Sequence, residues 1–178
     1  MVNYPNKKKN NHYTSMIEGK HNTAHRGMNL EEDINLTNEY YLSHDIAVIH
    51  KKPTPIQIVK VSYPERSSAK IVEAYFRTPS TTDYNGIYKG KYIDFEAKET
   101  KTLSFPFTNI SLHQINHLDK VIHHGGIAFL IIAFTKVNEV YLLDASFMVE
   151  AYRKNDRKSL RYETIKEKGH LIRQGFLP

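Results

Sequence analysis

The sequence predicts one α/β domain, and two features of its second half lead to this prediction. Residues 126–134 are almost continuously apolar, which is typical of a strand buried on both faces in the middle of a sheet. Residues 112–124 place Ile115, Leu118 and Val121 on one helical face, as in an amphipathic helix that covers a sheet. A chain of 178 residues suits a single core with an extended arm.

The composition limits the class of protein. Hydrophobic residues make up 40% and charged residues 25%, as in a soluble folded domain. The absence of cysteine excludes disulfides, thiolate zinc sites and cysteine nucleophiles. A net charge of +6 favours an anionic partner such as nucleic acid. No apolar run approaches the roughly 20 residues of a membrane helix, and the N-terminus lacks a signal-peptide pattern, so we expect a cytoplasmic protein without membrane association.

The N-terminal part predicts a basic arm followed by the domain. Residues 1–28 hold many Asn and Lys, one acidic residue and little apolar periodicity, so we expect this arm to be disordered. Asn29 can cap a helix that runs to about Leu42, with Glu32 three positions on as its capping-box partner. Residues 29–178 then form the single domain.

A β-rich excursion is expected after the first strand. A short apolar strand at residues 46–50 is followed by Pro53 and Pro55, which remove backbone donors and favour an extended exit from the core. Within residues 52–77, two segments rich in β-branched and aromatic residues predict paired strands. Two arrangements remain open from the pattern alone: a basic hairpin that projects, and an ordinary hairpin inside the main sheet.

The rest of the chain alternates strands and helices. Turn residues at 84–86 and 88–90 predict a hairpin that leads into a strand at residues 91–99. Further elements are expected in this order: the helix at 112–124, the central strand at 126–134, its partner strand at 139–143 and a helix from 145 to 152. Residues 153–178 are basic and predict a weakly structured end.

The strand at residues 91–99 carries the residues best suited to chemistry. Side chains alternate along a strand, which assigns two sets to opposite faces: Ile93, Phe95 and Ala97 to the core, and Asp94, Glu96 and Lys98 to the other face. The preceding hairpin would bring Asp83 beside them. Two carboxylates can hold Mg²⁺, and a lysine can neutralise charge on a phosphoryl group during hydrolysis. The same pattern also fits a solvated sheet face.

Two other patterns have simpler explanations. The sequence from His113 to His117 reads HQINH, but a zinc protease needs a glutamate where Gln114 stands, and no third ligand is evident. The acidic residues Glu31, Glu32 and Asp33 suit the first turn of a helix through its dipole. The approach of one of them to the metal site remains an alternative.

Several runs of residues closely resemble one nuclease family. They are IAVIHKKPTPIQIV at residues 46–59, STTDYNG at 80–86, YIDFEAKETK at 92–101 and SFP at 104–106. With these runs, roughly residues 26–150 resemble the RecU family of Holliday junction resolvases. The resemblance implies a restriction-endonuclease-like core of the PD-(D/E)xK type, with a central mixed sheet flanked by helices. It also implies that the excursion at about residues 52–77 is a projecting β-stalk.

The resemblance assigns roles to individual residues. It implies a Mg²⁺ site at Thr81, Asp83, Glu96 and Gln114, in which Mn²⁺ could substitute, and Lys98 as the residue that stabilises the transition state. Asp94 is not a ligand in the family pattern, so we expect it to be supporting or solvated. On the stalk, candidate DNA contacts are Lys60, Arg66, Lys70, Tyr75 and Arg77, with a merely solvated basic hairpin as the competing explanation.

The expected activity is resolution of four-way DNA junctions. The resemblance implies a Mg²⁺-dependent endodeoxyribonuclease that makes symmetric paired nicks during homologous recombination, DNA repair and chromosome segregation. Symmetric cleavage requires two active sites, so we expect a homodimer. A strand-exchange recombinase or branch-migration helicase is a candidate partner. The alternative is a non-catalytic protein of the same fold that binds branched DNA or modulates a recombinase.

Overall fold

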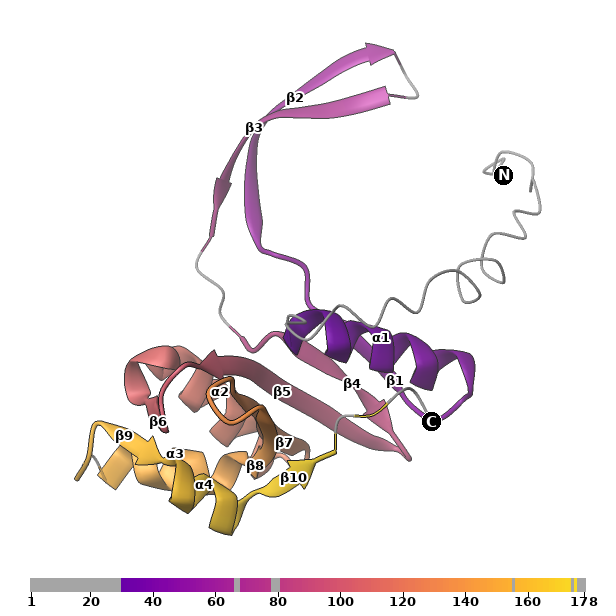
Figure 1. Cartoon of the computed structure of the whole chain (residues 1–178). Helices are drawn as coiled ribbons and strands as arrows, with labels where there is room; N and C mark the ends of the chain where they lie inside the picture. Colours follow the sequence, from indigo (N-terminus) through magenta and orange to yellow (C-terminus); the bar gives the residue numbers. More distant parts are fainter. Residues whose placement is uncertain (1–29, 66–67, 78–80, 155, 174, 176–178) are drawn as a thin grey trace.

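The computed structural model describes residues 30–65, 68–77, 81–154, 156–173 and 175. The expected N-terminal arm, the capping residue Asn29 and the candidate DNA contact Arg66 lie outside these residues. Within the described part, a sheet with helices on both faces forms the body, and one β-hairpin extends away from it (Figure 1). No described helix is long and apolar enough to cross a membrane.

The central sheet has mixed strand directions, as expected for the fold class. Its six strands, in spatial order, are β1 (Val48–Lys51), β4 (Tyr84–Tyr88), β5 (Lys91–Thr100), β7 (Ile127–Phe134), β8 (Glu139–Asp144) and β10 (His170–Ile172). The β5–β7 pair is parallel, and the other neighbouring pairs are antiparallel. A parallel pair needs a crossover, which α2 (Leu112–His123) provides.

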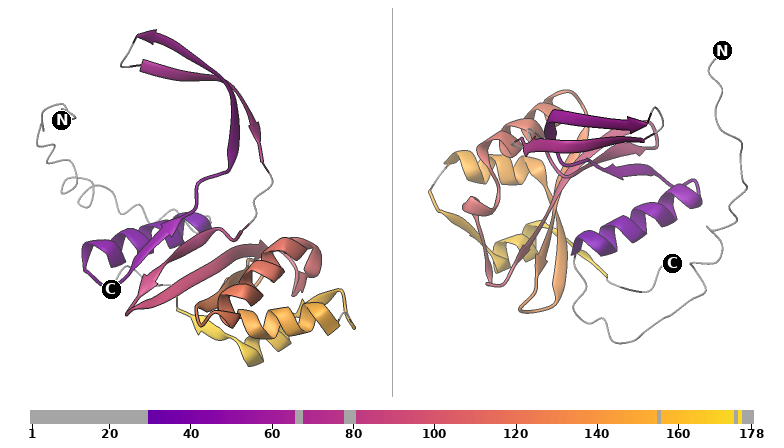
Figure 2. Two further views of the ribbon diagram at one scale, coloured as in Figure 1. Left: turned by 180° about the vertical axis from the view of Figure 1, so that it is seen from behind. Right: turned by 90° about the horizontal axis from the view of Figure 1, so that it is seen from above.

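Helices cover both faces of this sheet (Figure 2). On one face, α1 (Leu30–Ser43) packs against β1, β4 and β5. On the other face, α2 packs beside α3 (Ala145–Lys154) over β7. The central position predicted for residues 126–134 is confirmed: Leu130 and Ile132 of β7 are fully buried under α2 and α3, while Ile131 faces α1.

The hairpin that leads into β5 differs from the expectation in one detail. Residues 84–86 were expected to supply turn residues, but they lie within β4, and the turn is Lys89–Gly90. Both turn residues have positive φ, +47° and +76°, which suits the twist of a tight hairpin. Gly86 is needed for close strand approach, because a Cβ atom there would lie 2.0 Å from the Val48 carbonyl oxygen.

The weakly structured end predicted for residues 153–178 is wrong for most of its length. The segment contains β9 (Ser159–Arg161), α4 (Tyr162–Lys168) and the sheet strand β10. β9 pairs with β6 (Ser104–Pro106), which precedes the short helix η1 (Phe107–Asn109). Ile165 of α4 is fully buried in the core. These elements are too short to show a periodic pattern, and tertiary contacts stabilise them.

The hairpin within residues 52–77 is a sheet of its own. β2 (Ile56–Glu65) pairs only with β3 (Ser68–Phe76) among the described strands. Figure 1 shows the pair extending from the body, and we call it the stalk. At its base the N–H of Arg77 donates to the Pro55 carbonyl oxygen at 2.9 Å. The projecting arrangement leaves most stalk side chains exposed.

Candidate active site

The β4–β5 hairpin brings Asp83 next to Glu96. Its antiparallel register pairs Tyr84 with Phe95, so the residue before Tyr84 lies opposite the residue after Phe95. The backbone N–H of Asp83 donates to Glu96 Oε2 at 3.1 Å. Lys98, two positions further along β5, has its Nζ atom 2.5 Å from Glu96 Oε1 and 4.0 Å from Asp83 Oδ2. Strand alternation thus gathers the three candidate catalytic residues as expected.

The two carboxylates differ in their environment. The side chain of Glu96 is fully buried, whereas that of Asp83 is 41% exposed. Burial raises the pKa of Glu96 to about 7, although the neighbouring Lys98 ammonium acts in the opposite direction. A cation bound between the two carboxylates would favour the ionised form of Glu96.

Gln114 lies at the border of this cluster. Gln114, in the first turn of α2, donates from Nε2 to Glu96 Oε1 at 2.6 Å. Its Oε1 atom accepts from the Ser111 N–H at 3.0 Å and from Ser111 Oγ at 2.9 Å, which closes a capping box. In this arrangement Gln114 orients Glu96 and its own oxygen is occupied. Thr81 is half-buried and precedes Asp83 by two residues.

The donor set fits a hard divalent cation. Within the described ranges, no group of three or more His, Cys, Asp and Glu side chains is arranged around a metal position. Mg²⁺ does not require such a group, because it usually keeps several waters and binds one or two carboxylates together with substrate phosphate. Asp83 and buried Glu96 supply this minimum.

The HQINH segment of α2 does not form a shared histidine site. His113 Nε2 lies 3.1 Å from Ser111 Oγ, whereas His117 Nε2 lies 3.1 Å from Asp94 Oδ2. The two imidazoles are therefore bonded to different groups.

Asp94 is a second buried carboxylate on the face of β5 that carries Glu96. It is fully buried rather than solvated, and its carboxylate accepts hydrogen bonds from Lys52, Thr82, Tyr92 and His117. Burial alone would raise the pKa of Asp94, but these bonds, with that from Lys52 the strongest, hold it below its ordinary value. Of the two expectations for Asp94, the solvated one is therefore wrong. Apart from Tyr92 on the same strand, its partners come from other segments, so only the alternation of polar residues on β5 pointed to it.

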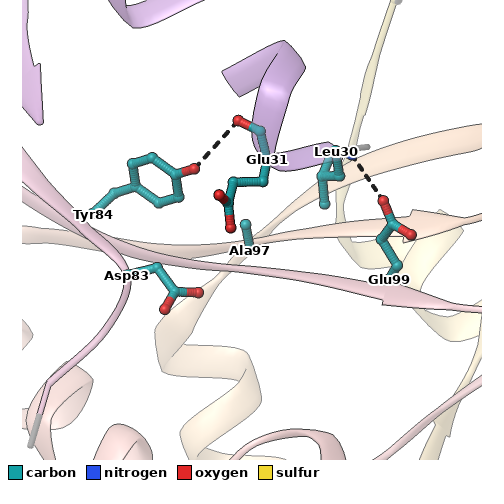
Figure 3. A pocket seen from close by; sticks show the side chains of 6 residues that line it. All are labelled: Leu30, Glu31, Asp83, Tyr84, Ala97 and Glu99. Carbon is teal, nitrogen blue, oxygen red and sulfur yellow. Dashed lines mark hydrogen bonds between the residues drawn. The ribbon is translucent and has the colours of Figure 1, made fainter. Parts of the chain in front are cut away.

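A small acidic cavity adjoins Asp83 on the α1 side of the sheet (Figure 3). Its volume is about 110 Å³, and its lining residues are Leu30, Glu31, Asp83, Tyr84, Ala97 and Glu99. Of the three acidic residues in the first turn of α1, Glu31 is the one that lines it, and Lys51 forms an ion pair with Glu31. Glu99 Oε1 accepts from the Leu30 N–H at 2.8 Å, which anchors the start of α1 on β5.

The candidate DNA contacts lie apart from this cluster, on the stalk. Lys60 is on β2, Lys70 and Tyr75 are on β3, and Arg77 follows β3; all four are exposed. The stalk also exposes large apolar side chains: Ile56, Ile58, Val59, Tyr63, Ile71, Val72, Tyr75 and Phe76. Such a surface on a free-standing hairpin is typical of a binding element.

Comparison with protein families decides the classification. The family model "Recombination protein U", RecU, matches residues 25–178 of this chain. This chain belongs to the RecU family. The mixed sheet and its flanking helices agree with the α/β class expected from the sequence.

Curated RecU proteins are similar to the chain over nearly its whole length. Holliday junction resolvase RecU of Bacillus cytotoxicus is 55% identical over 184 residues, covering 99% of this chain and 92% of the relative. The RecU protein of Bacillus thuringiensis strain Al Hakam is 55% identical over 186 residues, with the same coverage. Among solved structures, Hjc of Archaeoglobus fulgidus, a Holliday junction resolvase, matches with a TM-score of 0.47 and 11% identity over 79% of this chain and 91% of that one.

Proposed function

We propose that this chain resolves Holliday junctions as a divalent-metal-dependent endodeoxyribonuclease. Membership of the RecU family and the name shared by its curated relatives support this function. The observation that carries it is the grouping of Asp83, Glu96 and Lys98 on the β4–β5 hairpin. Catalysis needs these three together, whereas a protein that only binds DNA does not.

Mg²⁺ is the proposed cofactor, with Mn²⁺ able to replace it. Asp83 and Glu96 would hold the ion, with Thr81 and Gln114 as the further oxygen donors. When bound, the ion activates water and offsets charge on the phosphoryl oxygens. Gln114 also holds Glu96 in place through the hydrogen bond that its Nε2 atom donates. Its Oε1 atom would have to give up the hydrogen bond from Ser111 Oγ before it could bind the metal ion.

Lys98 provides the fixed positive charge of the site. Its ammonium group lies beside Glu96 and within 4.0 Å of Asp83, at the edge of the buried part of the cluster. A partly buried ammonium is well placed to stabilise charge that develops on the cleaved phosphodiester. Lys98 is therefore the proposed transition-state residue.

The stalk is the proposed element for recognition of junction shape. Lys60, Lys70 and Arg77, with Arg66 outside the described residues, would contact phosphates, and Tyr75 would stack on a base at the open centre. Their exposure on a hairpin that extends from the body supports this assignment. Symmetric paired nicks then require a homodimer, which brings two such sites to one junction.

The cellular setting is part of the same proposal. Junction resolution belongs to homologous recombination, DNA repair and chromosome segregation, and the protein would act in the cytoplasm on chromosomal DNA. A strand-exchange recombinase or branch-migration helicase is the proposed type of protein partner, since both work on the same branched intermediate.

Cleavage of a labelled four-way junction, compared with linear duplex of matching sequence, tests the function. Wild-type protein and Glu96→Gln are incubated with each DNA in Mg²⁺ or EDTA. We expect paired symmetric nicks only with wild-type protein, junction DNA and Mg²⁺, while both proteins bind the junction. If both bind the junction equally and neither cuts it, the non-catalytic alternative replaces the nuclease.

A further inference from the structure

Residues that flank the stalk in the sequence lie beside the candidate active site. Lys52 is the last residue before the Pro53–Pro55 segment that enters the stalk, and its N–H donates to the Asp83 carbonyl oxygen at 2.7 Å. Thr82 follows the returning strand and precedes Asp83. The segment before the stalk is thus hydrogen-bonded to the segment after it at Asp83, a proposed metal ligand.

Asp94 connects the two segments that flank the stalk to strand β5. The Nζ atom of Lys52 donates to Asp94 Oδ2 at 2.8 Å and to Thr82 Oγ1 at 2.9 Å, and Thr82 Oγ1 donates to Asp94. Asp94 lies on the same face of β5 as Glu96, two residues and roughly 7 Å away along the strand. One carboxylate therefore binds a residue on each side of the stalk in the sequence, Lys52 and Thr82, beside the buried acid of the site.

Stability alone does not account for this cluster. The side chain of Asp94 is fully buried and that of Lys52 is only 18% exposed. A buried ion pair contributes little compared with well-packed apolar residues, although loss of one partner leaves a costly uncompensated charge. Charged groups held in this way beside a reactive cluster are candidates for a functional role.

We propose that Asp94 and Lys52 are positioning residues that hold the base of the stalk and the Asp83 loop in one arrangement on β5. Through them, a junction bound by the stalk is presented to Asp83, Glu96 and Lys98 in register. This inference rests on the proposed function, because it concerns how the same site acts on branched DNA.

The first test uses Asp94→Asn, which preserves size but removes the charge and directs an amide NH₂ at groups that are themselves donors. We measure junction affinity in metal-free buffer and single-turnover cleavage over a Mg²⁺ titration. We expect unchanged affinity, because the stalk surface is intact, with cleavage lowered about 10- to 100-fold, as for other groups that orient metal ligands. We also expect faster amide exchange at the Lys52 N–H, with β7 and β8 as protected as in the wild type.

Lys52 supplies the second pair of variants and remains informative if Asp94→Asn does not fold. Lys52→Met removes the cation, and we expect the same split between affinity and cleavage; Lys52→Arg should restore most of the rate. The matched control is Lys168→Met on α4, which breaks a 2.8 Å ion pair with Glu167 on the surface. We expect it to cut like the wild type.

The possible results separate this inference from the proposed function. Wild-type cleavage rates in Asp94→Asn and Lys52→Met would overturn the positioning role. A drop in junction affinity and thermal midpoint alongside the drop in cleavage rate in both variants would also overturn it. If the wild type cuts no junction, the proposed function fails instead. Amide exchange at Lys52 in Asp94→Asn then still decides whether Asp94 fixes the base of the stalk.

Discussion

Asp83 and Glu96 face each other across the β4–β5 hairpin, and the backbone N–H of Asp83 donates a 3.1 Å hydrogen bond to Glu96 Oε2. This bond holds a partly exposed carboxylate beside a buried one. The exposed group is accessible to substrate and solvent, while the buried group is rigidly oriented. Such an asymmetric pair suits a cation that must contact both protein and phosphate.

Replacement of Lys98 should impair cleavage more than binding. In Lys98→Met the fixed positive charge beside Glu96 and Asp83 is lost, and we expect single-turnover cleavage of a four-way junction to fall about 10²- to 10³-fold. Junction affinity in metal-free buffer should change little. Lys101→Met, at an exposed position just beyond β5, serves as the control. Wild-type cleavage by Lys98→Met would contradict the role given to Lys98.

The metal-free protein should lose stability as pH rises through the range in which Glu96 ionises. Its pKa is raised from 4.5 to about 7 in the folded protein. Between these values the folded state holds a proton that the unfolded state has released, so the free energy of unfolding falls with rising pH. Added Mg²⁺ should bind ionised Glu96 and therefore raise the thermal midpoint more at pH about 8 than at pH about 6.

Glu96→Gln is the control for this pH effect. The glutamine side chain does not titrate. The fall in the free energy of unfolding that Glu96 causes, and the rise in thermal midpoint that Mg²⁺ causes, should therefore both disappear. Thermal unfolding of both proteins across the range, with and without Mg²⁺, gives the comparison. Identical pH profiles for the two proteins would contradict the assignment.

Basic residues of the stalk should contribute to the salt dependence of junction binding. If Lys60 and Lys70 each neutralise one phosphate, each alanine substitution should reduce the slope of log affinity against log salt by about 0.9. Both side chains are exposed, so thermal stability should be unchanged. Lys136→Ala, in the exposed turn between β7 and β8, is the control. Wild-type slopes for both stalk variants would assign phosphate contact elsewhere.

The C-terminal elements should contribute to the stability of the core. Ile165 of α4 has no exposed surface, so Ile165→Ala should lower the free energy of unfolding by about 2–5 kcal/mol through loss of contacts and a residual cavity. Leu36→Ala on α1, where the side chain is 44% exposed, should cost less than about 1 kcal/mol. Urea unfolding of both variants makes the comparison. Equal stabilities would show that α4 packs only loosely.

Local hydrophobic patterns were sufficient to predict an element wherever one segment was long enough to show a clear pattern. The apolar segment at 126–134 was expected in the centre of the sheet, because only there are both faces of a strand covered. The corresponding strand β7 lies between β5 and β8, as expected. The helix predicted at 112–124 is α2. By contrast, β9, α4 and β10 were missed because each is shorter than the window in which a period can be recognised.

The sequence by itself determined which candidate residues share one face of a strand. Strand alternation assigned Asp94, Glu96 and Lys98 to one face of β5, and the hairpin brought Asp83 beside them. Only the tertiary structure decided how deeply each side chain is buried, since alternation identifies a face but not what covers it. Packing of α2 and the base of the stalk against that face buries Asp94 and brings its donor Lys52, 42 residues away, into contact.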